Sequence, residues 1–148
     1  MKSRVTLSRA LPILFALLFG VAAAPSFAAQ TRMSDKDVEQ LMKNMGQDSR
    51  KFQSLFDAAI SKSVIRKTSQ EKDAKRLVDT FQKGTKNLYD HFKQTKKSDP
   101  YLQNSLDTAA QIEKLLQTTQ LDADTNAQWA KVRKELRDLA AAFNLPAH

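Results

Sequence analysis

The residues best suited to catalysis are few in this chain. It contains no cysteine and only two histidines, His91 and His148, so a thiol nucleophile and a haem attached through Cys-x-x-Cys-His are both excluded. His148 is the last residue, and His91 stands beside Asp90 without any further partner in the sequence. A general base needs an orienting partner and a pocket. We therefore expect no catalytic residue and predict that the protein is not an enzyme.

Haem and metal chemistry lack a matching set of ligands. Met42 or Met45 with His91 would formally suffice for a b-type haem, but methionines at helical spacing are typical core residues. A di-iron bundle needs Glu-x-x-His on two helices, whereas this chain has four glutamates and no such motif. Copper would require support from His or Cys near Met33, and neither is present. We expect no metal and no cofactor.

Glu113 is the one acidic residue in an awkward place. The apolar residues between Leu102 and Leu116 put it near the middle of a helical stripe, unless Ile112 faces inward and turns it to the edge. Burying an unpaired carboxylate costs several kcal/mol. An edge position with a Lys or Arg partner is therefore favoured over a buried functional carboxylate, and both remain open from the sequence.

The strongest functional signal is an uneven distribution of charge. Between Arg66 and Asp99 the chain has ten basic and five acidic residues, whereas the rest of the chain after residue 28 has eleven of each. At 100° per residue, many of these basic side chains share one helix face, opposite an apolar stripe that includes Leu77 and Phe81. The candidate face for an anionic partner consists of Lys72, Arg76, Lys83, Lys86, Lys93 and Lys97.

This basic face has two interpretations. It is suited to bind lipid head groups, lipopolysaccharide, an acidic polysaccharide or an acidic protein. It is equally typical of a solvated helix that keeps a protein soluble, and the charge pattern alone favours that interpretation. We expect no aromatic residue interleaved with these lysines. This expectation and the predicted export signal both disfavour nucleic acid as a partner.

The first 28 residues are typical of a cleavable Sec-type signal peptide. A basic start with Lys2, Arg4 and Arg9 precedes an uncharged, apolar stretch from 11 to 24, which is short for a membrane-spanning helix. Small residues at 26 and 28 then suit cleavage before Ala29.

Export defines the expected domain organisation and compartment. Residues 1–28 are predicted to be removed, and residues 29–148 are predicted to form a single domain of a size typical for one hydrophobic core. No cysteine lies near the cleavage site, so a lipoprotein is excluded. We expect a periplasmic or secreted protein whose mature form has no transmembrane helix.

Apolar residues that recur at steps of three and four predict four helices. The first begins after Ser34 and is about 26 residues long, and the second follows Thr68, which opens a capping box. The third is predicted to start at Pro100 with Asp99 as its N-cap, and the fourth near Asp124. Short connections favour an all-α, antiparallel up-down-up-down four-helix bundle. A flatter pair of helical hairpins that dimerises is the alternative, and the oligomeric state stays open.

Two stretches carry a resemblance to known proteins. Residues 32–38, RMSDKDV, and residues 129–143, WAKVRKELRDLAAAF, resemble a group of uncharacterised small secreted helical proteins of bacteria. This resemblance implies no particular activity or site. In size and charge the chain also resembles periplasmic helical stress chaperones, although it lacks their Leu-Thr-x-x-Gln repeats.

The sequence thus favours an exported, non-enzymatic helical protein that acts by binding, with the basic face as the contact surface for an anionic envelope component. The alternative is a periplasmic chaperone or stress-response protein that binds hydrophobic protein clients. An exposed apolar groove would distinguish the chaperone, because binding to an anionic component requires none.

Overall fold

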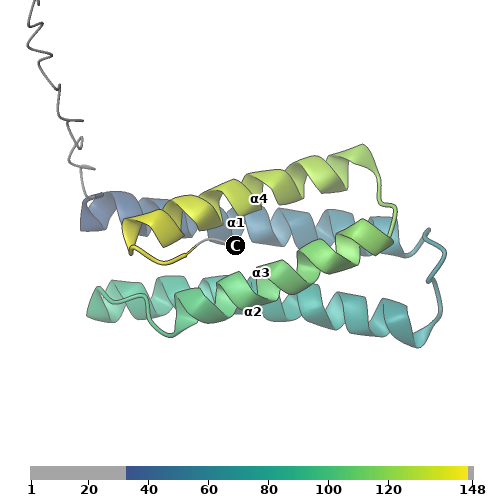
Figure 1. The fold of residues 1–148 in the computed structure, drawn as a ribbon, viewed down its shortest axis with the longest axis horizontal. Helices are drawn as coiled ribbons and strands as arrows, with labels where there is room; N and C mark the ends of the chain where they lie inside the picture. The colour runs from purple at the N-terminus through teal and green to yellow at the C-terminus, as the bar shows by residue number, and fades with distance from the viewer. Residues whose placement is uncertain (1–32, 147–148) are drawn as a thin grey trace, which may run out of the picture. The chain divides into compact units, whose positions relative to one another are not determined.

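The computed structural model describes residues 33–146 and shows four α-helices there. The helices are α1 (Asp35–Ile60), α2 (Ser69–Thr95), α3 (Tyr101–Thr118) and α4 (Ala123–Ala142). Successive helices run in opposite directions, and the described residues contain no strand (Figure 1). This part of the chain is an all-α, up-down-up-down four-helix bundle, as the spacing of apolar residues predicts. The proposed signal peptide, residues 1–28, lies outside the described residues.

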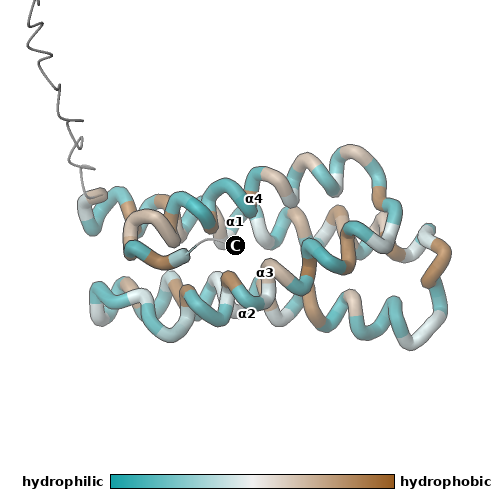
Figure 2. Tube along the Cα trace, viewed as in Figure 1, coloured by the Kyte–Doolittle hydropathy of each residue, from teal (hydrophilic) through white to brown (hydrophobic). Residues whose placement is uncertain are grey.

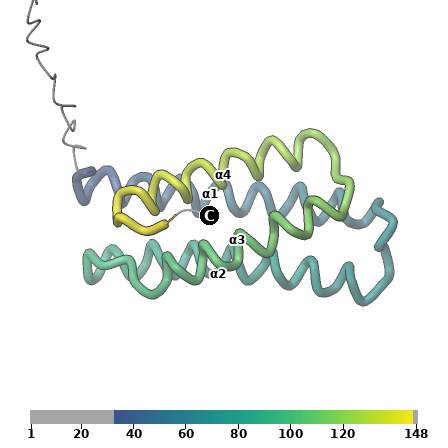
Figure 3. Tube along the Cα trace, in the orientation of Figure 1, coloured from purple at the N-terminus to yellow at the C-terminus, as the bar shows by residue number. Residues whose placement is uncertain are grey.

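Helices α1 and α2 form the central pair of the bundle. It packs against α2 along one side and against α4 along the other. Helix α3 packs against α2 and meets α4 over only a short stretch. The chain path in Figure 3 shows α4 beside α1 and α3 beside α2. Helices α1 and α2 therefore each take part in two of the three main helix interfaces.

The core is built from one apolar stripe on each helix, and the outward-facing residues are mostly hydrophilic (Figure 2). Trp129 of α4 contacts two aromatic rings on other helices. Its ring centroid lies 4.8 Å from that of Phe52 on α1 and 5.4 Å from that of Phe81 on α2. Aromatic pairs at these separations add stability beyond the area they bury. These contacts connect three of the four helices at one point.

The first two helix starts agree with the sequence. Ser34 Oγ accepts a hydrogen bond from the Asp37 backbone N–H at 3.2 Å, and Thr68 Oγ1 accepts one from the Glu71 N–H at 3.3 Å. The Glu71 carboxylate accepts a hydrogen bond from the Lys67 backbone N–H. In a standard capping box this carboxylate would accept from the N–H of the N-cap residue itself, Thr68.

The predicted N-cap of α3 is wrong, whereas α4 begins close to the predicted position. No side chain caps α3, whose N-cap is Pro100 in place of Asp99, because backbone bonds such as Leu102 N–H to Ser98 O at 3.0 Å close its first turn. Helix α4 is capped by Asp122. The Asp122 carboxylate accepts from both the N–H and the hydroxyl of Thr125, at 2.8 Å and 2.9 Å. Asp124 lies inside the first turn, where the helix dipole favours a negative charge.

Within residues 33–146, no helix combines the length and the apolar character that a membrane crossing requires. Each helix has polar residues on its outer side and apolar residues on its inner side. This pattern matches the amphipathic stripes from which the helices are predicted.

Replacing Trp129 tests the central aromatic contact. Trp129→Ala removes a buried ring that touches two helices, so it should lower the free energy of unfolding by about 3–5 kcal/mol. Trp129→Phe should cost clearly less, because Trp129 Nε1 has no hydrogen-bond partner among the described residues. Urea denaturation followed by circular dichroism measures both, with Val64→Ala at a 94% exposed position as control. A Trp129→Ala midpoint equal to the wild-type value would refute this assignment.

Candidate functional site

The six side chains of the predicted basic face are all exposed to solvent. Five of them lie on the outer side of α2, opposite its buried stripe, and Lys97 follows the end of the helix. Tyr89 lies between Lys86 and Lys93 in the sequence, and the Lys93 ammonium is 5.6 Å from the centre of its ring. The expectation that no aromatic residue is interleaved with the lysines is therefore wrong.

Local ion pairs neutralise part of this basic face. Three of its six cations pair with aspartates one turn away on α2, whereas Lys72, Lys93 and Lys97 have no ion pair among the described residues. The pairs are Arg76 with Asp73 at 2.9 Å, Lys83 with Asp79 at 2.8 Å, and Lys86 with Asp90 at 2.6 Å. Exposed pairs of this kind contribute about 0–1 kcal/mol to stability. Their main consequence is a lower net charge on the outer side of α2.

Helix α1 adds cations that the sequence analysis missed. Lys43 and Arg50 of α1 and Lys86 of α2 line a groove of about 240 Å³ between the two helices, which we call the α1/α2 groove. An adjoining hollow of about 340 Å³ is lined by Lys36, Lys43 and Lys96. The sequence does carry a signal for this arrangement. Lys36, Lys43 and Arg50 are spaced by seven residues, which puts them on one face of a helix.

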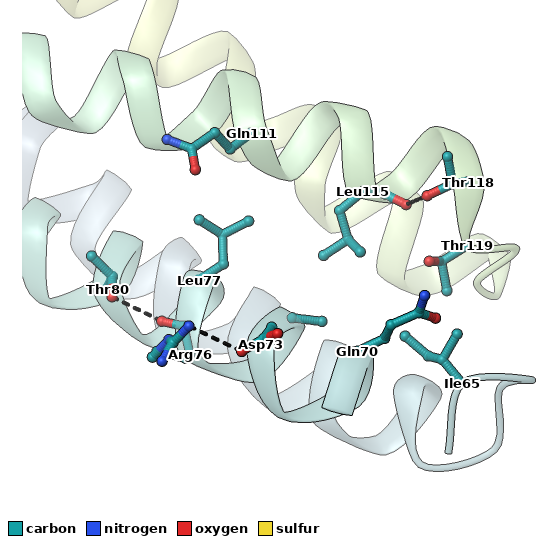
Figure 4. Close-up of a pocket in the computed structure, with 11 residues that line it drawn as sticks. Ile65, Gln70, Asp73, Arg76, Leu77, Thr80, Gln111, Leu115, Thr118 and Thr119 are labelled. Carbon is teal, nitrogen blue, oxygen red and sulfur yellow. Dashed lines mark hydrogen bonds and ion pairs between the residues drawn. The ribbon is translucent and has the colours of Figure 1, made fainter. Parts of the chain in front are cut away.

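A larger cleft lies on the other side of α2, between α2 and α3. It has a volume of about 800 Å³. Figure 4 shows Leu77 of α2 and Leu115 of α3 pointing into it, together with the amide of Gln111. Arg76 lines this α2/α3 cleft, whereas Lys86 lines the α1/α2 groove. The predicted basic face therefore borders two different hollows, one on each side of α2.

The histidine and methionines considered for haem lie on different elements. His91 of α2 packs against the ring of Tyr101 on α3, with centroids 4.8 Å apart. Met42 and Met45 of α1 are completely buried in the core. Within the described part of the chain, no group of three His, Asp or Glu side chains is placed to hold a metal ion.

Glu113 occupies the edge position that the sequence favours. Its side chain is 28% exposed and pairs with Arg133 of α4 at 3.3 Å. Ile112 is the residue that faces the core, and it is completely buried. Helix α3 is therefore rotated so that Ile112 faces the core and Glu113 lies at the edge. This is the orientation expected from the cost of burying an unpaired charge.

Glu135 of α4 is the buried carboxyl group that the sequence analysis missed. It is only 8% exposed, and its Oε2 atom has no hydrogen-bond partner among the described residues. It belongs to a polar cluster at the α1/α4 interface centred on Asp48. Gln128 Nε2 donates to Asp48 Oδ1 at 3.0 Å and to its backbone oxygen at 3.1 Å. Lys131 Nζ lies 2.8 Å from Asp48 Oδ2.

The two carboxyl groups of this cluster have opposite pKa shifts. Burial, the hydrogen bond with Asp48 and the negative charge of Asp48 together raise the pKa of Glu135 to about 7, against the opposing charges of Lys131 and Lys134. Burial also acts to raise the pKa of Asp48. The hydrogen bonds that Asp48 accepts from Lys131, Gln128 and Glu135 outweigh that effect and hold its pKa below the usual range. A protonated Glu135 that donates to an ionised Asp48 explains both shifts.

The Asp48–Glu135 cluster resembles an acid–base pair, but it lies apart from the two hollows beside α2. Neither the α1/α2 groove nor the α2/α3 cleft is lined by these two residues. A carboxyl pair that does chemistry must reach its substrate directly or through one water. We therefore treat the cluster as a structural feature of the α1/α4 interface.

Comparison with known proteins gives no further constraint on the site. No protein-family model, curated protein or solved structure matches this chain. The functional inference therefore depends on the charges, hollows and buried groups of the described residues themselves.

Glu135→Gln tests the buried carboxyl group through the pH dependence of stability. Because the pKa of Glu135 is raised by folding, its protonated form stabilises the native state below about pH 4.5, and this contribution is lost as the pH rises towards 7. The variant keeps a donor for Asp48 without a charge. We expect its free energy of unfolding to match that of wild type at pH 4 and to exceed it by about 2–4 kcal/mol at pH 8.

Urea denaturation at several pH values provides the measurement for this prediction. Glu113→Gln, at a partly exposed glutamate, is the matched control for the loss of one carboxyl group. Parallel pH profiles for wild type and Glu135→Gln would contradict the assignment.

Proposed function

We propose that this protein is an exported, non-enzymatic binding protein whose basic surface on α2 contacts an anionic component of the cell envelope. The basic face supports the proposal because all six of its cations project into solvent from the outer side of the bundle. The pattern of residues 1–28 supports export. Anionic phospholipid and lipopolysaccharide are the partners that fit this compartment and this charge.

The position of α1 strengthens this proposal. Its cations Lys36, Lys43 and Arg50 lie beside α2 and have no ion pair among the described residues. They extend the positive surface beyond the helix on which the sequence places it. A cluster of cations on one side of a protein raises the local concentration of anionic partners and speeds their association.

A chaperone of hydrophobic clients is the second candidate. The α2/α3 cleft supports it, because Leu77 and Leu115 point into a hollow of about 800 Å³ (Figure 4). However, polar side chains such as Thr80 and Gln111 line the same cleft, and Val64 is the one fully exposed large apolar residue among those described. Apolar client binding usually requires a larger exposed patch. The binding of an anionic component is therefore the better supported function.

Salt-dependent binding to vesicles tests the proposed function. We expect the exported protein to bind phosphatidylglycerol vesicles and lipopolysaccharide at low salt, and to bind phosphatidylcholine vesicles much less. Binding should weaken as salt rises, because added ions screen exposed charges. A variant with Lys72, Arg76, Lys83 and Lys86 changed to Glu should bind at least about tenfold more weakly.

The control for that variant has four exposed basic residues of the other helices changed to Glu, so its net charge changes by the same amount. These positions are Lys51, Lys114, Lys134 and Arg137. If both variants lose binding equally, only net charge matters and the face on α2 has no special role. If the wild-type protein binds none of the anionic surfaces, the proposed function is wrong.

Suppression of aggregation tests the chaperone candidate separately. Leu77→Asp places a charge in the α2/α3 cleft and should abolish protection of a heat-unfolded client if that cleft binds clients. Light scattering of the client measures protection, and Asp107→Asn on the exposed side of α3 serves as control. Under the function proposed here, the wild-type protein gives no protection at an equal molar ratio.

A further inference from the structure

We propose that the α1/α2 groove is a binding site for the head group of an anionic phospholipid, with Lys43 and Arg50 of α1 as its main contacts. This inference rests on the proposed function. It places the specific contact in the groove between α1 and α2, and not only on the outer side of α2. No residue of the predicted basic face lies on α1.

The shape of the α1/α2 groove comes from a glycine in the middle of α1. Gly46 lies between Lys43 and Arg50, and a Cβ atom built on it would meet nothing within 4 Å. The absent side chain therefore leaves open space at the surface and does not serve close helix packing. Glycine inside a helix costs about 1 kcal/mol relative to alanine. Packing gives no reason to keep glycine at this position, whereas an open groove does.

The charges around the groove are unbalanced in favour of cations. Five basic and two acidic side chains line the groove and the adjoining hollow. Each of the two acids already pairs with a lysine, one within α2 and one directly after its end. The pairs are Lys86 with Asp90 at 2.6 Å and Lys96 with Glu39 at 3.1 Å. The cations of α1 are left available for an external anion, and an arginine among them can bind a phosphate through two parallel hydrogen bonds.

The floor of the groove favours an amphiphilic anion over a purely polar one. The half-buried ring of Tyr89 borders the groove on the α2 side and supplies its accessible apolar surface, because Met42 beneath it is completely buried. The apolar stems of the lysines and the arginine add to these walls. A phospholipid places a phosphate directly beside its apolar part, so one molecule can contact the cationic rim and the apolar floor together. An acidic polysaccharide has no such apolar part.

The groove lies at the surface of the bundle, next to the outer side of α2. Lys86 belongs both to the predicted basic face and to the groove. A membrane surface that approaches this side of the protein would therefore meet the basic face and the groove together. The basic face would supply long-range attraction, and the groove would supply the specific contact.

Two adjacent residues of α1 allow a matched test. Arg50 lines the groove, whereas Lys51 is equally exposed one residue later and does not line it. Arg50→Glu and Lys51→Glu change the net charge by the same amount on the same helix. With phosphatidylglycerol vesicles at low salt, we expect Arg50→Glu to weaken binding at least about tenfold and Lys51→Glu less than about threefold.

A second variant tests the shape of the groove without any change in charge. Gly46→Leu fills the open space and should weaken vesicle binding at least about fivefold, with Gly46→Ala intermediate. Because a Cβ atom at this position meets nothing within 4 Å, the rest of the leucine side chain can extend into the groove, and leucine is a better helix former than glycine; the melting temperature should not fall. Circular dichroism confirms the fold of each variant before binding is measured.

The outcomes separate this inference from the proposed function. If Arg50→Glu and Lys51→Glu weaken binding equally and Gly46→Leu binds as wild type, the groove is not the site, although the proposed function stands. If these variants bind as wild type while an acidic peptide competes with the vesicles, the partner is a protein and the inference is wrong. If wild type does not bind phosphatidylglycerol vesicles at all, both proposals fall.

Discussion

The arrangement of the bundle depends on the contact of Trp129 with Phe52 and Phe81, which connects α4 to α1 and α2 in one buried cluster. Helix α1 supplies the central surface, since it packs against α2 on one side and α4 on the other. Helix α3 depends on α2 for most of its packing, because it meets α4 only briefly. The chain has no disulfide to supplement this core, so apolar packing around α1 holds the helices together.

The two sides of α1 differ in polarity and in exposure to solvent. The side that faces α4 carries a buried polar cluster, and the side that faces α2 carries the proposed binding groove. On the α4 side, Asp48 and Glu135 form a closed polar cluster that places a titratable group inside the protein. On the α2 side, Gly46 leaves a groove that is open to solvent and bordered by cations. A buried carboxyl group affects stability as the pH changes, whereas an open cationic groove is available to a ligand. The proposed binding site therefore lies on the α2 side.

The sequence predicted the features that depend on residues close together in the chain. The four helices, the caps at Ser34 and Thr68 and the inward position of Ile112 all follow from local spacing and the cost of burying charge. The Asp48–Glu135 cluster and the α1/α2 groove were missed, because each brings together residues of two helices whose relative rotation is set by packing. Glu135 directly precedes the core residue Leu136, and a change in rotation would place it at the edge.

Backbone amide shifts measured by NMR during a titration with phosphatidylglycerol bicelles would test most directly whether recognition occurs between α1 and α2. Gly46 and Gly84 are the only glycines after residue 28, so their signals are easily distinguished. Gly84 is an internal reference, because it faces Ser105 of α3. Our account predicts the largest shifts at Gly46 and its neighbours Lys43 and Arg50, with little change at Gly84. Shifts centred on Gly84 and Leu77, or no shifts at all, would contradict it.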